Sequence, residues 1–168
     1  QVKLEPEQRL YRITIPTNFT FICSDELTTI VEEYLKKFAD LGVPLLLSAS
    51  VDGALIEDNR PHSCELDIPL KVIRDDAYYE KLFAFCRKHY YKFHPMIHSQ
   101  HIDKWIDNYE WYKRMLLSHD MHLSDLYLLE VRNEEWTQED IKEFQKFLEY
   151  LQEDLWNIAD GDSEKYLE

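Results

Sequence analysis

The sequence predicts an α/β fold, in which about four parallel strand-helix units form part of a (β/α) barrel. Two observations lead to this prediction. Short apolar segments alternate with longer segments whose apolar residues recur every three or four positions, as strands alternate with amphipathic helices. Each apolar segment also becomes polar at its C-terminal end, which is where the strands of parallel α/β proteins meet their ligands.

Four segments are predicted as strands: residues 12–16, 44–53, 93–97 and 126–129. The second is the most informative, because an apolar run leads into the polar sequence Ser48-Ala49-Ser50-Val51-Asp52 and a final glycine. The other three run into polar residues, namely Asn18, His98 and the sequence Glu130-Val131-Arg132. We therefore expect functional side chains on one shared edge, formed by the C-terminal ends of the strands.

The first helix is predicted after Asn18, with Ser24 or Asp25 as the residue that caps its N-terminus. Its apolar positions have helical spacing: Leu27, Ile30, Val31, Tyr34, Leu35, Phe38 and Leu41. Gly42 follows the last of them, where a residue in the left-handed conformation commonly ends a helix. The helix leads directly into the second strand, so the two strands are expected to pair in parallel through a right-handed crossover.

Three further helices are predicted along the chain. Asp75 and Asp76 favour the start of the second helix, whose inner face is predicted to be Tyr79, Leu82, Phe83 and Cys86. The third starts near Ser99 and carries its apolar residues at Ile102, Trp105, Ile106, Tyr109, Tyr112 and Leu116. The fourth opens on Thr137 and Asp140, which are spaced as in a capping box, and continues with Ile141, Phe144, Phe147, Leu148, Leu151 and Leu155.

Length and composition predict one soluble domain covering residues 1–168, since 45% of the residues are hydrophobic and 31% are charged. The net charge of -14 argues against a nucleic-acid or membrane partner, because phosphate-bearing surfaces attract clustered Lys and Arg. No apolar run approaches the roughly 20 residues that cross a bilayer, and no signal peptide is recognisable. The 3 cysteines are widely spaced and are interpreted as reduced thiols, which predicts a cytoplasmic protein.

A complete eight-stranded barrel typically needs about 250 residues, so this chain would supply about half of one and leave two open parallel edges. A small, open, doubly wound sheet is the alternative. The abrupt beginning and end of the sequence favour a segment from the middle of a larger barrel. The long connection between Gly53 and Asp75 is expected to be functional or to contact the remaining part of that barrel.

Two groups of motifs carry a family resemblance, and the order and spacing of the motifs weigh more than any one of them. Residues 13–18 (ITIPTN), 46–53 (LLSASVDG) and 59–61 (NRP) resemble the middle of a radical S-adenosylmethionine enzyme. Residues 93–98 (FHPMIH), 105–109 (WIDNY) and 129–137 (LEVRNEEWT) are similar to a subgroup of that family that modifies ribosomally made peptides. The resemblance covers nearly the whole chain.

The resemblance implies a partial (β/α) barrel that binds S-adenosylmethionine along the shared edge and acts on a peptide. Ser50 would then hydrogen-bond the ribose or the amino-acid end of the cofactor, and Asn18 would line the neighbouring position. Asp52 would shape the turn or accept hydrogen bonds from cofactor hydroxyls. Arg60 would pair with the methionyl carboxylate or support its own loop. The implied substrate-binding residues are His98, Glu130 and Arg132.

One departure from the family is large. Its Cys-x3-Cys-x2-Cys loop, which holds a [4Fe–4S] cluster through three thiolates, is absent, since Cys23, Cys64 and Cys86 do not have that spacing. The glycine-rich segment that usually follows the loop is missing too. We therefore expect the cluster ligands to lie outside this chain, and the chain by itself to be inactive. With the cluster, such an enzyme generates a 5′-deoxyadenosyl radical that abstracts hydrogen from its substrate.

Simpler interpretations remain open for the individual residues. Ser50 and Asp52 can act only as turn residues that bond their own backbone. Glu130 and Arg132 lie two positions apart, so on a strand they share a face and can form a structural ion pair instead of contacting substrate.

Two wider alternatives also remain. His94, His98 and His101 suggest a metal site, but no acidic or thiol ligand lies at a suitable spacing, so no metal is predicted. For the chain as a whole, the alternative to an enzyme segment is a non-catalytic acidic α/β module. Such a module would bind a partner protein through its exposed sheet edges or its aromatic helices.

Overall fold

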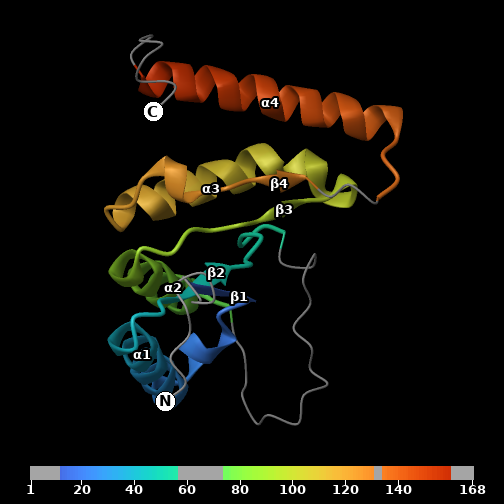
Figure 1. Cartoon of the computed structure of the whole chain (residues 1–168). Coiled ribbons are helices and arrows are strands. Elements are labelled where there is room, and N and C mark those ends of the chain that lie inside the picture. Colours follow the sequence, from blue (N-terminus) through green and yellow to red (C-terminus); the bar gives the residue numbers. More distant parts are fainter. Residues whose placement is uncertain (1–11, 57–73, 131–133, 160–168) are drawn as a thin grey trace, which may run out of the picture.

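The computed structural model describes residues 12–56, 74–130 and 134–159, and within these ranges strand segments alternate with helices. Figure 1 shows the helices stacked in the order in which they occur along the chain, with the strand segments beside them. In chain order the elements are β1 (Ile13–Thr17), η2 (Thr20–Cys23), α1 (Asp25–Asp40), β2 (Leu45–Ala49), α2 (Asp76–His89), β3 (Met96–Ile97), η4 (Ser99–Lys104), α3 (Trp105–Ser118), η5 (Leu123–Asp125), β4 (Leu129–Glu130) and α4 (Gln138–Ile158).

The strands are parallel, as predicted. β1 pairs with β2, with Ile13 opposite Leu45 and Thr17 opposite Ala49. β3 pairs with β4, and isolated parallel bridges from Phe93 to both Ala49 and Leu126 connect the two pairs. The four segments therefore run side by side in chain order, which confirms a mixed α/β fold with parallel pairing.

The last three strands are shorter than predicted. β2 ends at Ala49, so residues 50–53 of the predicted second strand have no regular secondary structure. Phe93 bridges to both neighbours, but the regular strand β3 begins only at Met96. Pro95 lies between them, and a proline has no N–H group to donate to a strand ladder. The third helix also differs from the prediction, because the residues from Ser99 to Lys104 form a 3₁₀ helix and the α-helix begins at Trp105.

The predicted helix ends are confirmed at several positions. Ser24 caps α1 by accepting a hydrogen bond from the N–H of Leu27, and Gly42 follows the helix with a φ of +74°. Asp75 caps α2 in the same way, by accepting from the N–H of Tyr78 at 2.9 Å. Thr137 and Asp140 form the predicted capping box at the start of α4, each accepting from the other's backbone N–H.

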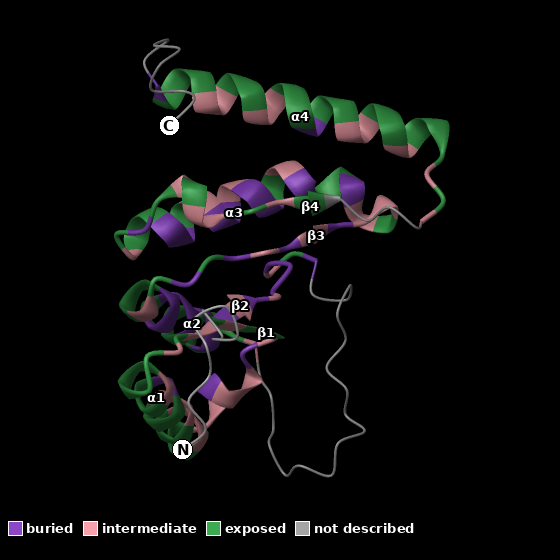
Figure 2. Ribbon diagram, viewed as in Figure 1, coloured by how far each residue is buried: buried purple, intermediate pink, exposed green. Residues whose placement is uncertain are grey.

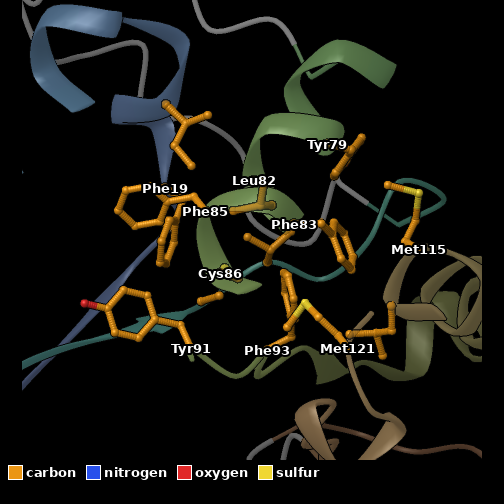
Figure 3. Packing of buried hydrophobic residues seen from close by; sticks show 14 of the residues in the cluster. Phe19, Tyr79, Leu82, Phe83, Phe85, Cys86, Tyr91, Phe93, Met115 and Met121 are labelled. Atoms are coloured by element: carbon orange, nitrogen blue, oxygen red, sulfur yellow. The ribbon is translucent and has the colours of Figure 1, made fainter. Parts of the chain in front are cut away.

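The main core lies between the strands and helix α2, and its inner face is the one predicted. Figure 3 shows Leu82, Phe83 and Cys86 of α2 among aromatic side chains from neighbouring elements. Phe83 stacks on Phe93 with ring centroids 4.4 Å apart, which joins the helix to the third strand segment. The chain from residue 44 to 53 is therefore covered on one side by a closely packed aromatic layer.

A second, smaller core joins α3 to α4. Trp105 and Tyr109 of α3 pack there with Phe147 of α4, and all three are buried. Ile97 of β3 and Ile56, which follows the second strand, complete this core. Helix α3 therefore contacts both the strand ends and the last helix.

The inner faces predicted for α1 and α4 are only partly buried. Leu35 is buried in α1, but Ile30 and Tyr34 remain 41% and 52% exposed. In α4, Phe147 is buried whereas Leu148 is exposed. Figure 2 shows both helices largely in the colour of exposed residues. The apolar faces of these two helices are partly exposed because α1 and α4 lie at the two ends of the helix stack, where each has a described neighbour on one side (Figure 1). None of the helices in the described ranges is long and apolar enough to cross a membrane.

Candidate functional site

The C-terminal ends of β1 and β2 meet at one edge, as the sequence predicted. The N–H of Ser50 donates to the carbonyl of Thr17 at 2.9 Å, which extends the pairing of the two strands by one step. Ser50 and Asn18 are therefore neighbours on adjacent strand ends. Both side chains are half-buried.

Asn18 is fixed by two hydrogen bonds. Its side-chain oxygen accepts from the N–H of Thr20 at 3.3 Å, and its carbonyl accepts from the hydroxyl of Tyr78 at 3.1 Å. The next residue, Phe19, has a φ of +58° and a fully buried ring. The side-chain NH₂ group of Asn18 has no hydrogen-bond partner among the described residues, so it remains available to a ligand.

Ser50 has an available hydroxyl as well. Its Oγ atom makes no hydrogen bond to any residue in the described part of the chain, although the side chain is half-buried. Leu47 and Ala49 of β2 and Val51 just after it are buried, whereas Ser50 lies at the alternate position and is less covered. A half-buried hydroxyl on the open side of a parallel sheet is suited to hydrogen-bond a polar ligand.

Asp52 is deeply buried, since only 1% of its surface is exposed. Its Oδ1 atom accepts from the N–H of Met96 at 2.8 Å. The carboxylate thus joins the end of β2 to the start of β3. This contact corresponds to the shaping of the turn, one of the two roles considered from the sequence, and the other role, accepting hydrogen bonds from cofactor hydroxyls, stays a prediction.

Helix α3 holds the same turn from the other side. The hydroxyl of Tyr112 donates to the carbonyl of Val51 at 2.6 Å, and the side-chain nitrogen of Asn108 donates to the carbonyl of Asp52 at 2.8 Å. Asn108 is fully buried. It was not predicted as a site residue, although a polar residue between Trp105 and Tyr112 on an otherwise apolar helix face is a signal that could have identified it.

His98 lies directly after β3, beside an acidic residue that the sequence did not single out. Its Nδ1 atom is 3.6 Å from a carboxylate oxygen of Glu134, and the other carboxylate oxygen accepts from the N–H of Ser99 at 2.9 Å. The Nε2 atom of His98 is buried and has no hydrogen-bond partner among the residues that the structure describes. The predicted substrate-binding histidine is therefore at the expected edge, next to the end of the third strand.

Three predicted site residues remain, and the structure describes only one of them, Glu130. Glu130 is the last residue of β4 and pairs in register with Ile97. Arg60 and Arg132 lie outside the described residues, as does Cys64. The proposed contact between Glu130 and Arg132 remains a prediction.

A polar pair on the open face of the sheet was not predicted as part of the site. The hydroxyl of Ser48 and the Nδ1 atom of His94 are 2.9 Å apart, and the ring of His94 also contacts that of Tyr127, with centroids 5.7 Å apart. In the sequence, His94 belongs to the motif of residues 93–98 and to the histidines that suggest a metal site, but no site role is predicted for it. The period of two along β2 and the third segment places Ser48, Ser50 and His94 on one face.

The described residues do not provide the ligands of an iron–sulfur cluster. Cys23 lies on η2 and is partly buried, and Cys86 is a buried residue of α2. Burial raises the pKa of the Cys86 thiol well above its ordinary value, which opposes the thiolate form that metals bind. Within residues 12–56, 74–130 and 134–159, no group of three His, Cys, Asp or Glu side chains could hold a metal ion.

No protein-family model, no curated protein and no solved structure matches this chain.

Proposed function

We propose that this chain is the central segment of a radical S-adenosylmethionine enzyme that modifies a peptide. Its strand ends would hold the cofactor and the substrate. The observation that carries the proposal is the pair of available polar groups on adjacent parallel strand ends, the Oγ of Ser50 and the side-chain NH₂ of Asn18. Ligands of parallel α/β proteins bind at this edge, and the resemblance of residues 13–18 and 46–53 implies the cofactor at the same place.

The described residues fit S-adenosylmethionine but not the cluster. A hydroxyl and an amide NH₂ group can hydrogen-bond the ribose hydroxyls or the amino-acid end of the cofactor, while the apolar body of β2 packs beneath them. The cluster ligands are proposed to lie outside this chain. When both groups are bound in such an enzyme, they supply the 5′-deoxyadenosyl radical, and the contribution of this chain is to bind and orient the reactants.

The partial barrel belongs to the same proposal. Parallel strand segments in chain order, each followed by a helix, are the arrangement from which (β/α) barrels are built. Exposed apolar residues at the β1 side, such as Ile15 and Ile30, are consistent with contact to the remaining part of the barrel. The half-covered faces of α1 and α4 have the same explanation.

The proposal is tested by titrating the chain with S-adenosylmethionine and following backbone-amide chemical shifts. We expect the shifts to concentrate at residues 17–19 and 48–53, and Ser50→Ala to weaken binding by about tenfold, the usual effect of losing one buried hydrogen bond. Ser124→Ala is the matched control, because this exposed serine lies on η5, before a segment that pairs with Phe93 and not with β1 or β2. Equal affinity of the wild type and Ser50→Ala would contradict the assigned role of Ser50.

The iron–sulfur part of the proposal needs the complete gene product. After anaerobic reconstitution with iron and sulfide, we expect it to be brown and to contain iron. Its sequence should also contain a Cys-x3-Cys-x2-Cys loop upstream of residue 1. A complete product without that loop, or a colourless and iron-free preparation, would contradict the enzyme proposal.

The second candidate function is a protein-binding module, and one observation favours it. An open cavity of about 740 Å³ lies between the C-terminal half of α4 and the chain before β4. Its lining is mostly apolar and includes Leu126, Tyr127, Leu151, Leu155 and Ile158. If the chain were such a module, S-adenosylmethionine would cause no shifts at the strand ends, and the titration therefore separates the two functions.

A further inference from the structure

The turn that follows Ser50 is held at three successive residues. The carbonyl of Val51 accepts from the hydroxyl of Tyr112, and the carbonyl of Asp52 accepts from the side chain of Asn108. The carboxylate of Asp52 accepts from the backbone of Met96. Two of these contacts come from α3 and one from the start of β3, so the turn is fixed from two sides.

The third held residue is Gly53, where the turn touches α3 directly. Gly53 has a φ of +111°, which side chains rarely tolerate. A Cβ atom added there would lie 2.2 Å from Oδ1 of Asn108. Oδ1 is buried and has no hydrogen-bond partner within the described part of the chain, so there the orientation of the Asn108 amide is set by its bond to the carbonyl of Asp52. The absence of a side chain at position 53 is therefore what allows α3 to approach the turn this closely.

These contacts have a consequence for Ser50, which directly precedes the held residues. A turn free to rotate would present the hydroxyl of Ser50 in many directions, and binding would have to select one of them. Buried hydrogen bonds to the carbonyls of the next two residues remove that freedom before a ligand arrives. Residues far from the ligand can affect affinity in this way without contacting it.

We propose that Asn108 and Tyr112 are positioning residues for the strand-end site. They hold the turn of residues 51–53 so that Ser50 faces a ligand in one orientation. The role of this orientation in binding S-adenosylmethionine rests on the proposed function. The conclusion that Asn108 and Tyr112 hold the turn does not rest on the proposed function.

Tyr112→Phe tests the proposal, because it removes one hydroxyl and keeps the buried ring. Tyr109→Phe is the matched control: it also removes a hydroxyl of α3, but that hydroxyl donates to Asp154 of α4 at 2.8 Å. We expect Tyr112→Phe to accelerate amide hydrogen exchange of residues 51–56 and to weaken S-adenosylmethionine binding, each by about tenfold. Tyr109→Phe is expected to leave both quantities unchanged.

Asn108→Asp is a second variant of nearly the same size, in which a carboxylate oxygen replaces the donor that faces the carbonyl of Asp52. It should also accelerate exchange at residues 51–56. Unchanged exchange in both Tyr112→Phe and Asn108→Asp, in folded protein, would overturn the proposal, as would equal effects of Tyr112→Phe and Tyr109→Phe. If the wild-type chain does not bind S-adenosylmethionine, the proposed function fails, and the exchange rates alone then decide whether α3 holds the turn.

Discussion

The close approach between Gly53 and Asn108 leads to a quantitative prediction for Gly53→Ala. The new residue would keep a φ of +111°, and holding a side chain in so sparsely populated a conformation costs about 1–3 kcal/mol. Its Cβ would lie 2.2 Å from Oδ1 of Asn108, so the Asn108 side chain must move. Leaving the carbonyl of Asp52 buried without that partner costs about 1–3 kcal/mol more. We expect a total loss of about 4 kcal/mol.

Gly42→Ala is the matched control. Gly42 also has a positive φ, +74°, but none of the described residues lies within 4 Å of a Cβ added there. Only the conformational cost remains, which is about 1 kcal/mol for a single residue in the left-handed region. The free energy of unfolding can be measured with urea, following tryptophan fluorescence, because Trp105 and Trp111 are buried in the two cores.

A third variant separates the two contributions. In Gly53→Ala combined with Asn108→Ala the steric conflict is gone, so the added cost of the glycine substitution should fall to the conformational part. The two substitutions should thus be clearly non-additive, as expected for residues in direct contact. If Gly53→Ala and Gly42→Ala destabilise the protein equally, within about 0.5 kcal/mol, the inferred close contact is wrong.

Three further predictions concern the rest of the fold. Phe83→Ala should destabilise the protein by about 3–5 kcal/mol in urea unfolding, because the lost ring leaves a cavity against Phe93; a loss below about 1 kcal/mol would mean that this core is loosely packed. Thr137→Ala should cost about 1 kcal/mol and reduce the helical circular dichroism signal, since the first turn of α4 loses its cap; an unchanged unfolding midpoint would contradict this. Burial raises the pKa of Tyr91 to about 12. As the pH rises above about 10, the unfolded state therefore loses the phenolic proton before the folded state does, and the free energy of unfolding should decrease between about pH 10 and pH 12. Tyr91→Phe should flatten this decrease in a series of melting temperatures, and an equally steep decrease in the variant would show that Tyr91 is not its cause.

The parts of the fold that were predictable are those decided by local chemistry. Ser24 and Thr137 cap helices in the structure because a side-chain oxygen near a free N–H group needs no distant partner. The inner face of α2 was also predictable, since this helix lies between other elements and its whole apolar face is covered. The faces of α1 and α4 were not. Helical periodicity identifies an apolar face but says nothing about whether a neighbour covers it, and Tyr34 and Leu148 are exposed.

The candidate site was predictable in position but not in the roles of its residues. The polar ending of the second strand correctly located the edge where Ser50 meets Asn18. Nothing in the sequence distinguished the open hydroxyl of Ser50 from the carboxylate of Asp52, which is occupied by a backbone contact 44 residues away. The role of Asn108 depends on a similarly distant contact. Such pairings arise only when the chain folds, so single-sequence patterns do not contain them.

The contact between Asp52 and Met96 affects the spacing of the second and third strands. Their backbones pair at Ala49 and Phe93, Pro95 then offers no donor, and the next link is a carboxylate from one strand to an amide of the other. A side chain spans a wider gap than two hydrogen-bonded backbones do. The carboxylate of Asp52 therefore links the two strand ends at this edge, and Asp52→Glu, which lengthens that link by one methylene group, is expected to change their separation while leaving the pairing of Ala49 with Phe93 intact.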